Sequence, residues 1–333
     1  MSNTPSHLRD SDEPGSAALS VVLVTPDTGL ALGRVLRCLG RQSMAARIEV
    51  IIAAPDPAQV ALPENLGAVF HRVAVVPADV STSACGRAAA IRASRTPIVA
   101  LAEDHCFPVD ECWAERIVAA HDADIAAVGP CVGNANPATG RSWANLAIEY
   151  GPWLAVDRAQ STDRLPGHNT YYKRAALLAY DNQLEDLLEA EYVLHQAMHR
   201  AGQRLVIDPR LRVEHLNQSK PGISRQVQYL SGRMFAASRA HAWPWPRRLL
   251  YGLGAPLIPP LRLARAIGHL LRLDQGPRLA VKALPTLIVI LLWSGYGECV
   301  GYLFGDGGRR TDLADHEFDR GRFVIESERA LAQ

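Results

Sequence analysis

The feature that most constrains the fold is a series of short apolar runs, separated by segments with helical spacing, within the first 132 residues. Five runs have the length and the Val, Ile, Leu and Ala content of buried strands: 19–25 (LSVVLVT), 48–54 (IEVIIAA), 68–76 (AVFHRVAVV), 96–102 (TPIVALA) and 124–132 (DIAAVGPCV). The segments between them predict helices over 29–42, 84–93 and 110–120. Strands that alternate with helices form a mostly parallel sheet with helices on both faces, so we expect an α/β fold.

The second half of the chain has a different pattern. Residues 139–180 are irregular, and their most distinctive segment is LPGHNTYYKR (165–174). A long helix is predicted over 183–201, short strands over 205–209 and 211–215, and a mostly polar helix over 221–240. We therefore expect one domain over 19–240.

The chain begins with a polar segment, residues 1–18, that contains no apolar stretch. This segment is predicted to be disordered, and it does not have the pattern of a secretory signal. At the other end, residues 309–333 are predicted to form a C-terminal tail.

Residues 241–308 are predicted to form an apolar, basic module. The apolar stretch 249–271 is interrupted by prolines, and the stretch 279–304 contains LIVILLW (287–293) between Pro285 and Gly295. Since a span needs about 20 uninterrupted apolar residues, shallow or re-entrant insertion is favoured over two complete crossings. Against Asp274 alone, the basic residues between 247 and 297 are Arg247, Arg248, Arg262, Arg265, Arg272, Arg278 and Lys282. This composition suits an anionic membrane surface, and the alternative is a helical cap on the catalytic domain or on a second copy.

Bulk composition excludes few classes of function. The net charge of +1 and the absence of a basic stripe with interleaved aromatic residues disfavour nucleic-acid binding. The six cysteines are scattered without a C-x-x-C pair, which is typical of free thiols in a reducing compartment. A zinc site of His105, Cys106 and Cys112 is an alternative, but it lacks an evident fourth ligand.

Three chemically active side chains, Glu103, Asp104 and His105, directly follow the predicted strand 96–102. Because ligands of parallel sheets bind beyond the carboxyl ends of the strands, these residues lie where a substrate is expected. Carboxylates and imidazoles can also ligate a divalent cation. In an extended segment Glu103 and His105 would face one way and Asp104 the other. The alternative is a solvated polar loop.

One acid lies among the apolar residues of the predicted helix 183–201. Glu191 follows Leu188 by three residues and precedes Leu194 by three, so it shares their face. A buried carboxylate costs several kcal/mol unless it is paired or used, and we interpret Glu191 as a candidate general base. The alternative is an ion pair with an arginine. His195, on the same face, is interpreted as a packing residue or as the partner of Glu191.

Two further segments carry candidate binding residues. Residues 167–169 (GHN), followed by Lys173 and Arg174, combine a flexible backbone with amide donors and positive charge, which suits sugar hydroxyls or a diphosphate. A plain turn is the alternative. His215 ends the predicted strand 211–215, and it can complete a metal site only if the fold brings it to His105.

The order of these segments resembles that of the family 2 inverting glycosyltransferases, which have the GT-A fold. The segments are LSVVLVT, IEVIIAA, ACGRAAAIRAS, TPIVALAEDHCFP, LPGHNTYYKR and EAEYVLHQAMHRAG, and they span residues 19–215. The chain is most similar to bacterial members with EDH in place of Asp-x-Asp. The resemblance implies a Rossmann-like, mostly parallel sheet flanked by helices, followed here by a C-terminal helical membrane-associating module.

The resemblance also implies a nucleotide-sugar donor and a divalent metal, Mg²⁺ or Mn²⁺. Glu103 and Asp104 match the first two positions of the Asp-x-Asp motif, with Glu103 near the ribose of the nucleotide. His105 matches the metal-binding acid, and His215 matches a position that supplies another metal ligand in some relatives. Glu191 matches the catalytic base.

The remaining donor-binding residues follow from the same resemblance. Residues Gly167, His168 and Asn169 match the loop that lines the donor sugar, and Thr25 and Arg174 are assigned to the donor site with them. The acid that commonly reads uracil after the second strand is Ala54 here, and Asp56 is the candidate substitute.

These interpretations lead to one main hypothesis. An inverting glycosyltransferase would move a sugar from a nucleotide donor to a lipid-linked or polysaccharide acceptor at the cytoplasmic face of the cell membrane. The alternative is a non-catalytic GT-A-like module that binds nucleotide or membrane in an assembly complex. A nucleotidyltransferase would need a glycine-rich basic loop after the first strand, which TPDTGLALGR (25–34) matches poorly.

Overall fold

The computed structural model describes residues 16–122, 124–308 and 316–332. Its contacts divide the chain into two compact units, Met1–Glu103, Pro108–Pro130 and Ala159–Leu211 in the first, and Asp104–Phe107, Cys131–Arg158 and Arg212–Gln333 in the second. Most of the predicted disordered segment, residues 1–15, lies outside the described residues, as do residues 309–315 of the predicted tail. The predicted domain limits at 240 and 308 both fall inside the second unit and stay a prediction.

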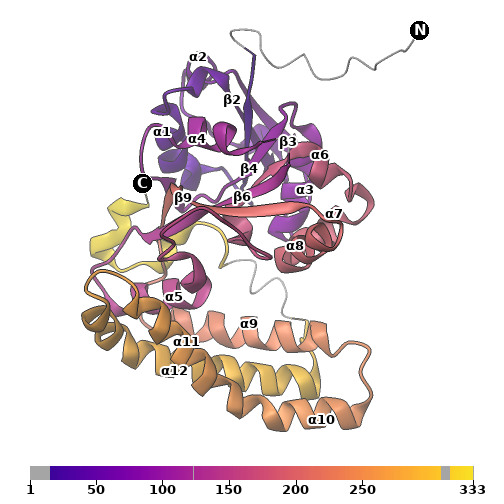
Figure 1. The fold of residues 1–333 in the computed structure, drawn as a ribbon, viewed down its shortest axis with the longest axis vertical. Helices are drawn as coiled ribbons and strands as arrows, with labels where there is room; N and C mark the ends of the chain where they lie inside the picture. Colours follow the sequence, from indigo (N-terminus) through magenta and orange to yellow (C-terminus); the bar gives the residue numbers. More distant parts are fainter. Residues whose placement is uncertain (1–15, 123, 309–315, 333) are drawn as a thin grey trace. The chain divides into compact units, whose positions relative to one another are not determined.

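The first unit is built on a sheet whose first four strands are parallel (Figure 1). These strands are β1 (Leu19–Val24), β2 (Ile48–Ala54), β3 (Arg72–Pro77) and β4 (Ile98–Leu101), in the order β3-β2-β1-β4. Every residue of β1 and β2 is buried, which explains why both are apolar except for Ser20 and Glu49, whose side chains are hydrogen bonded to each other. The predicted α/β class and the parallel arrangement of these strands are confirmed.

Beyond β4 the sheet becomes mixed. The strand β8 (Tyr171–Lys173) pairs antiparallel with β4 and with β6 (Ile125–Asn134), and β7 (Gln160–Ser161) pairs antiparallel with β9 (Arg204–His215). The two strands predicted at 205–209 and 211–215 are thus one strand. Pro209 does not break it, because the φ of proline is compatible with an extended backbone.

The helices of the first unit largely follow the predicted pattern. They are α1 (Gly33–Gly40), α2 (Leu66–Val69), α3 (Ser83–Ala93), α4 (Trp113–Ala120), α6 (Arg174–Leu178), α7 (Leu184–Glu189) and α8 (Glu191–Arg200). Two predictions were wrong in detail. The segment predicted as a strand over 68–76 begins inside α2, and the helix predicted over 183–201 is broken at Ala190, where φ is −140° and ψ is 78°.

The second unit is mainly helical. Its helices are α5 (Gly140–Glu149), α9 (Ile223–Arg239), α10 (Trp245–Gly254), α11 (Ile258–Leu271) and α12 (Gly276–Phe304). In Figure 1, α12 runs along α9, and α5, α10 and α11 also pack against α12. The described part of the C-terminal tail forms two short 3₁₀ helices, η8 (Arg320–Phe323) and η9 (Glu326–Leu331).

Close packing of α9 against α12 depends on glycines. A Cβ at Gly297 would lie 2.2 Å from the carbonyl oxygen of Tyr229, and a Cβ at Gly301 would lie 2.3 Å from that of Arg233. The same face of α12 buries Glu298, whose carboxylate pairs with Arg262 of α11 at 2.9 Å. This face of α12 is therefore an internal contact of the unit.

Pro285 and Gly295, the predicted bounds of the apolar centre 287–293, do not end the helix. The helix α12 is continuous for 29 residues and contains Pro285. A proline inside a helix costs about 3 kcal/mol, because it removes one backbone hydrogen bond and its ring crowds the carbonyl four residues earlier. The packing of α12 on α9 and α11 opposes this cost. By length and composition α12 could cross a membrane, a test that buried helices of soluble proteins also pass.

Candidate active site

The candidate site of the first unit forms where the parallel strands end. Glu103 follows β4 by two residues, as predicted. Because β8 runs antiparallel to β4, the residues just before β8 lie beside the end of β4, and the N–H of Leu101 donates to the carbonyl of Thr170. This pairing brings the 3₁₀ turn η5 (Gly167–Asn169) to Glu103, where the Asn169 amide donates to Glu103 Oε2 at 2.7 Å.

Glu191 reaches the same cluster from another element. It is the first residue of α8, is 8% exposed, and pairs through Oε1 with Arg87 Nη1 at 3.1 Å. Arg87 lies on α3, and Gly86 lets this helix approach β1 closely, since a Cβ there would lie 2.7 Å from Val24. The burial predicted for Glu191 is confirmed, although the continuous helix assumed in that prediction is not formed.

His168 links the two acids. Its Nδ1 lies 3.2 Å from Glu103 Oε1, and its Nε2 lies 3.2 Å from Glu191 Oε1. Burial and the positive charge of Arg87 act against protonation, but the carboxylates of Glu191 and Glu103 outweigh them and raise the pKa of His168 from 6.5 to about 9. The raised pKa favours the imidazolium at neutral pH, with Nε2 facing Glu191. Arg87 Nη2 also lies 2.8 Å from Nδ1, so Arg87 and Glu103 compete for that nitrogen.

Gly167 is required by the proximity of Glu191. A Cβ at residue 167 would lie 2.9 Å from Glu191 Oε2 and 3.0 Å from Glu191 Cδ. Any larger residue would push the carboxylate aside. All three residues of the GHN segment therefore contribute to the cluster, so the plain-turn alternative does not describe it.

The other predicted donor-binding residues of this unit have local contacts. Thr25 is buried just after β1, and its hydroxyl donates to Asp27 at 3.2 Å. Asp56 follows β2, is exposed, and caps a 3₁₀ turn by accepting from the N–H of Ala58 at 3.0 Å. Because β1, β2 and β4 are parallel, both residues lie at the same edge of the sheet as Glu103.

Arg174 lies at the opposite end of β4. Its backbone N–H donates to the carbonyl of Pro97, and its guanidinium donates to Ser94 at 3.1 Å. The antiparallel pairing of β8 produces this separation, because residues 167–169 precede β8 and Arg174 follows it. The structure does not bring Arg174 to the cluster.

His195 is a packing residue and not the partner of Glu191. It is fully buried, stacks on Tyr172, and lies 2.7 Å from the hydroxyl of Tyr172. Burial, with a smaller contribution from Arg164, lowers the pKa of His195 to about 4. The ring is therefore neutral at physiological pH.

Arg87 was missed at the level of sequence. It lies three residues after Ala84 and four before Ile91, on the buried side of a helix rich in alanine. Like Glu191, Arg87 is a charged residue on the apolar face of a helix, so the same pattern could have identified it. The alternative interpretation of Glu191 predicted an ion pair with an arginine, and Arg87 forms that ion pair.

The second unit holds the other predicted residues of the EDH motif. Asp104 Oδ1 and His105 Nδ1 are hydrogen bonded to each other, and Asp104 Oδ2 accepts from the backbone N–H of Asp319 at 2.7 Å. The extended backbone assumed for this motif is not formed, because residues 104 and 105 form a turn.

His105 and His215 are neighbours, as the predicted metal site requires. Their ring centroids are 4.8 Å apart, and their candidate ligand nitrogens lie within 4.8 Å of one another. His215 Nδ1 lies 2.8 Å from the side-chain oxygen of Asn217. With both Nδ1 atoms hydrogen bonded to oxygen, each ring presents Nε2, the arrangement common in metal-binding histidines.

A guanidinium lies at one of these two nitrogens. Arg320 Nη2 is 2.9 Å from His105 Nε2 and, since arginine only donates, it uses the lone pair that a metal would need. A permanent positive charge at this distance also repels a divalent cation. With the tail in this position, the residues do not fit a metal ion at His105. No sequence pattern marked Arg320, which lies in a polar segment.

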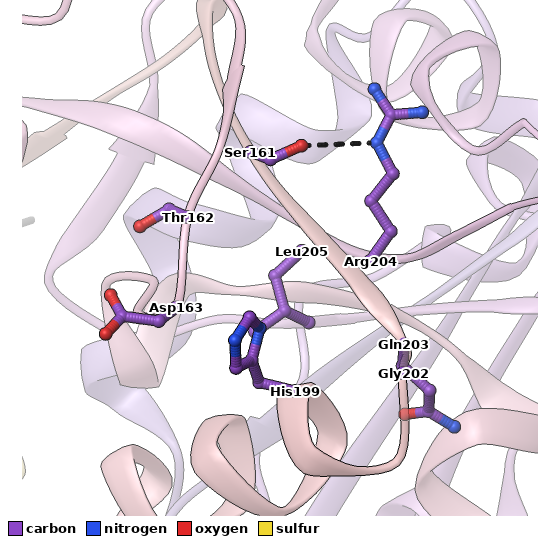
Figure 2. Close-up of a pocket in the computed structure, with 8 residues that line it drawn as sticks. All are labelled: Ser161, Thr162, Asp163, His199, Gly202, Gln203, Arg204 and Leu205. Atoms are coloured by element: carbon purple, nitrogen blue, oxygen red, sulfur yellow. Dashed lines mark hydrogen bonds between the residues drawn. The ribbon is translucent and has the colours of Figure 1, made fainter.

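Neither the cysteines of the zinc alternative nor the pocket shown in Figure 2 contributes a residue to the cluster of Glu103, His168 and Glu191. Cys106 lies in the second unit and Cys112 in the first, and all six cysteines are free, as expected from their scattered spacing. Figure 2 shows a separate, open pocket of the first unit, where Arg204 donates to Ser161 at 3.3 Å. Its lining residues are Ser161, Thr162, Asp163, His199, Gly202, Gln203, Arg204 and Leu205, none of which was predicted as a site residue.

Comparisons with known proteins give distant similarities only. No protein-family model and no curated protein matches the chain. Among solved structures, it is similar to a mannosyltransferase (PcManGT) from Pyrobaculum calidifontis in complex with GDP-Man and Mn²⁺, with 14% identity, 90% of each chain covered and a TM-score of 0.47.

Two other solved structures are similar at the same level. TarS 1–349 of S. aureus has 12% identity and a TM-score of 0.43, with 89% of this chain and 92% of that chain covered. GalNAc-T7 with UDP, GalNAc and Mn²⁺ has 16% identity and a TM-score of 0.46, with 68% of this chain and 52% of that chain covered. Because these TM-scores are below 0.5, the conclusions below rest on the strand arrangement and on the residues of the site.

Proposed function

We propose that the protein is a glycosyltransferase of the inverting, family 2 type, with a GT-A fold and a nucleotide-sugar donor. One observation carries the proposal: Glu103 and Glu191, 88 positions apart in the chain, are joined through the single imidazole of His168 at the carboxyl edge of the parallel strands. These are the residues that the family resemblance assigns to donor binding and to the catalytic base. Ordinary packing gives no reason for a buried acid and a half-buried acid to share this position.

The proposed reaction is a single displacement. The oxygen of an acceptor hydroxyl attacks the anomeric carbon of the donor, the bond from that carbon to the diphosphate oxygen breaks, and the nucleoside diphosphate leaves. Glu191 takes the proton of the attacking hydroxyl. His168 and Arg87 hold Glu191 Oε1, while Oε2 faces Gly167, so the carboxylate has a defined orientation.

The resemblance also implies Mg²⁺ or Mn²⁺ at His105 and His215. When bound, such an ion supplies positive charge that stabilises the departing diphosphate. Since Arg320 uses His105 Nε2, we assign no step of the reaction to a metal.

The acceptor is proposed to be lipid-linked or a polysaccharide at the cytoplasmic face of the membrane. Support comes from the second unit, where α10, α11 and the turn between them expose large apolar side chains. These are Trp245, Leu250, Leu253, Leu257, Leu261 and Leu271. The same helices carry Arg247, Arg248, Arg262 and Arg265. Exposed leucines beside arginines suit the interface of an anionic bilayer.

The non-catalytic alternative also has an observation in its favour. Glu191 Oε1 is held by two cations, Arg87 and His168, as in a purely structural ion pair. Turnover separates the two proposals. Purified full-length protein should release nucleoside diphosphate from one donor in a panel of UDP- and GDP-sugars, and Glu191→Gln should not. Binding without turnover would favour the non-catalytic module, and turnover by Glu191→Gln at the wild-type rate would remove Glu191 from its role.

A further inference from the structure

Arg320 is a buried cation with no acidic partner among residues 16–122, 124–308 and 316–332. It is 7% exposed, and its one assigned hydrogen bond goes to Nε2 of His105. Its Nε is buried and has no hydrogen-bond partner within the described part of the chain. Arg87, which is 4% exposed, also has a buried Nε without a hydrogen-bond partner, but its guanidinium is paired with the carboxylate of Glu191.

A buried guanidinium in this condition is costly. Removing a charge from water costs several kcal/mol unless an opposite charge and hydrogen bonds replace the water. The nearby carboxylate of Asp104 is already engaged with His105 and with the backbone of Asp319. An anion from outside the chain would satisfy the remaining N–H donors of Arg320.

The surrounding residues hold Arg320 in one orientation. Asp104 fixes the ring of His105 through Nδ1, and His105 then accepts from Arg320 through Nε2. The segment 319–323 is held at both ends. At one end the carboxylate of Asp104 accepts from the N–H of Asp319. At the other end the carbonyl of Phe323 accepts from the N–H groups of Ser219 and Lys220. The planar guanidinium is therefore preorganised, a property that suits bidentate binding of phosphate oxygens.

We propose that Arg320, oriented by His105, binds a diphosphate and supplies the positive charge that the family resemblance assigns to a divalent metal. The ligand class is a diphosphate ester. Two sources share this chemistry, the nucleotide donor and a lipid-linked acceptor. The identity of the ester rests on the proposed function, whereas diphosphate binding without metal does not.

The first test is calorimetric titration of the full-length protein with inorganic pyrophosphate in excess EDTA. Wild type is expected to bind, and Arg320→Gln is expected to bind about tenfold more weakly or worse, since a charge-assisted contact is lost. Arg322→Gln is the matched control, because Arg322 is on the same 3₁₀ helix and its side chain is 68% exposed. Equal binding by wild type and Arg320→Gln would overturn the proposal.

A conservative variant guards against simple unfolding. Arg320→Lys keeps the charge but not the planar fork, so it should bind more tightly than Arg320→Gln and more weakly than wild type. Thermal unfolding of all variants in the absence of ligand identifies any that fail to fold. A Lys variant that is folded and binds no better than the Gln variant would contradict the role of charge.

The metal test uses Mn²⁺ alone, followed by electron paramagnetic resonance. Wild type should not bind Mn²⁺ tightly, and pyrophosphate should bind equally with and without it. Stoichiometric Mn²⁺ binding, or pyrophosphate binding that depends on Mn²⁺, would overturn the inference while leaving sugar transfer possible. If the protein bound pyrophosphate without metal but turned over no donor, the inference about Arg320 would be supported and the proposed sugar transfer would be contradicted.

Competition then identifies the source of the diphosphate. Displacement of pyrophosphate by UDP or GDP supports the donor, and displacement by farnesyl diphosphate supports a lipid-linked acceptor. If UDP, GDP and farnesyl diphosphate all failed to displace pyrophosphate, Arg320 would not bind diphosphate esters and the proposal would be wrong.

Discussion

The two units each contain a buried charged cluster, and the clusters differ in how their charges are balanced. In the first unit, Arg87 and the imidazolium of His168 face the carboxylates of Glu103 and Glu191. In the second, Arg320 contacts Nε2 of His105, and Asp104 is hydrogen bonded to His105 and to the backbone of Asp319. The cations of the first cluster thus face carboxylates, whereas no carboxylate among the described residues pairs with Arg320.

This difference separates two ways of building a site. A balanced cluster holds its groups in position before the substrate arrives, which is the requirement for positioning a base. An unbalanced buried cation gains most of its stabilisation only when an anion binds.

Replacing Glu191 should have the largest effect. Glu191→Gln removes the proton acceptor, so kcat should fall by roughly 10²–10⁴-fold in steady-state assays. The control is Glu189→Gln, which changes an exposed acid two residues away on α7. Equal activities of the two variants would mean that the first cluster is structural only.

Gly167→Ala probes the same carboxylate without changing any charge. The new Cβ would lie 2.9 Å from Glu191 Oε2, so the carboxylate must shift. We expect kcat to fall by roughly 10–100-fold, because small displacements of a catalytic group are costly. Gly67→Ala serves as the control, since a Cβ there meets no atom within 4 Å. A fully active Gly167→Ala would show that the position of Glu191 is unimportant.

The balance of the first cluster should appear in the pH dependence of stability. The pKa of His168 rises from 6.5 to about 9 on folding. Its contribution is therefore complete below about pH 6.5 and is lost as the pH rises through about 9. Urea unfolding should show that the wild type loses roughly 1–3 kcal/mol more than His168→Gln between these pH values. If the free energy of unfolding changed with pH equally in the two proteins, His168 would not be protonated in the folded protein at neutral pH.

The exposed apolar side chains of the second unit should affect membrane binding alone. Leu253→Asn with Leu257→Asn should weaken binding to anionic vesicles by about tenfold in flotation assays, because less apolar surface enters the bilayer. Val69→Asn, on the first unit, is the matched control, since Val69 is also an exposed apolar residue. If the control weakened binding equally, the apolar side chains of α10 and its following turn would not be the membrane contact.

Much of the first unit could be predicted because its signals are local. The strands β1, β2 and β4 and the helix α3 appear within a few residues of their predicted limits. Continuous apolar runs and helical spacing report burial directly. Predictions failed where a local rule was overridden, as at Ala190, where the helix breaks, and at Pro285, where packing keeps it intact.

Local sequence patterns are enough to specify the α/β arrangement, the place of residues 103–105 after a buried strand, and the burial of an acid at 191. Which charges meet depends on the path of the chain in three dimensions. The antiparallel insertion of β8 brings His168 to Glu103 and removes Arg174, and the return of the chain near residue 320 gives His105 a guanidinium. These pairings join residues up to 215 positions apart, and no local periodicity can encode a contact at that separation.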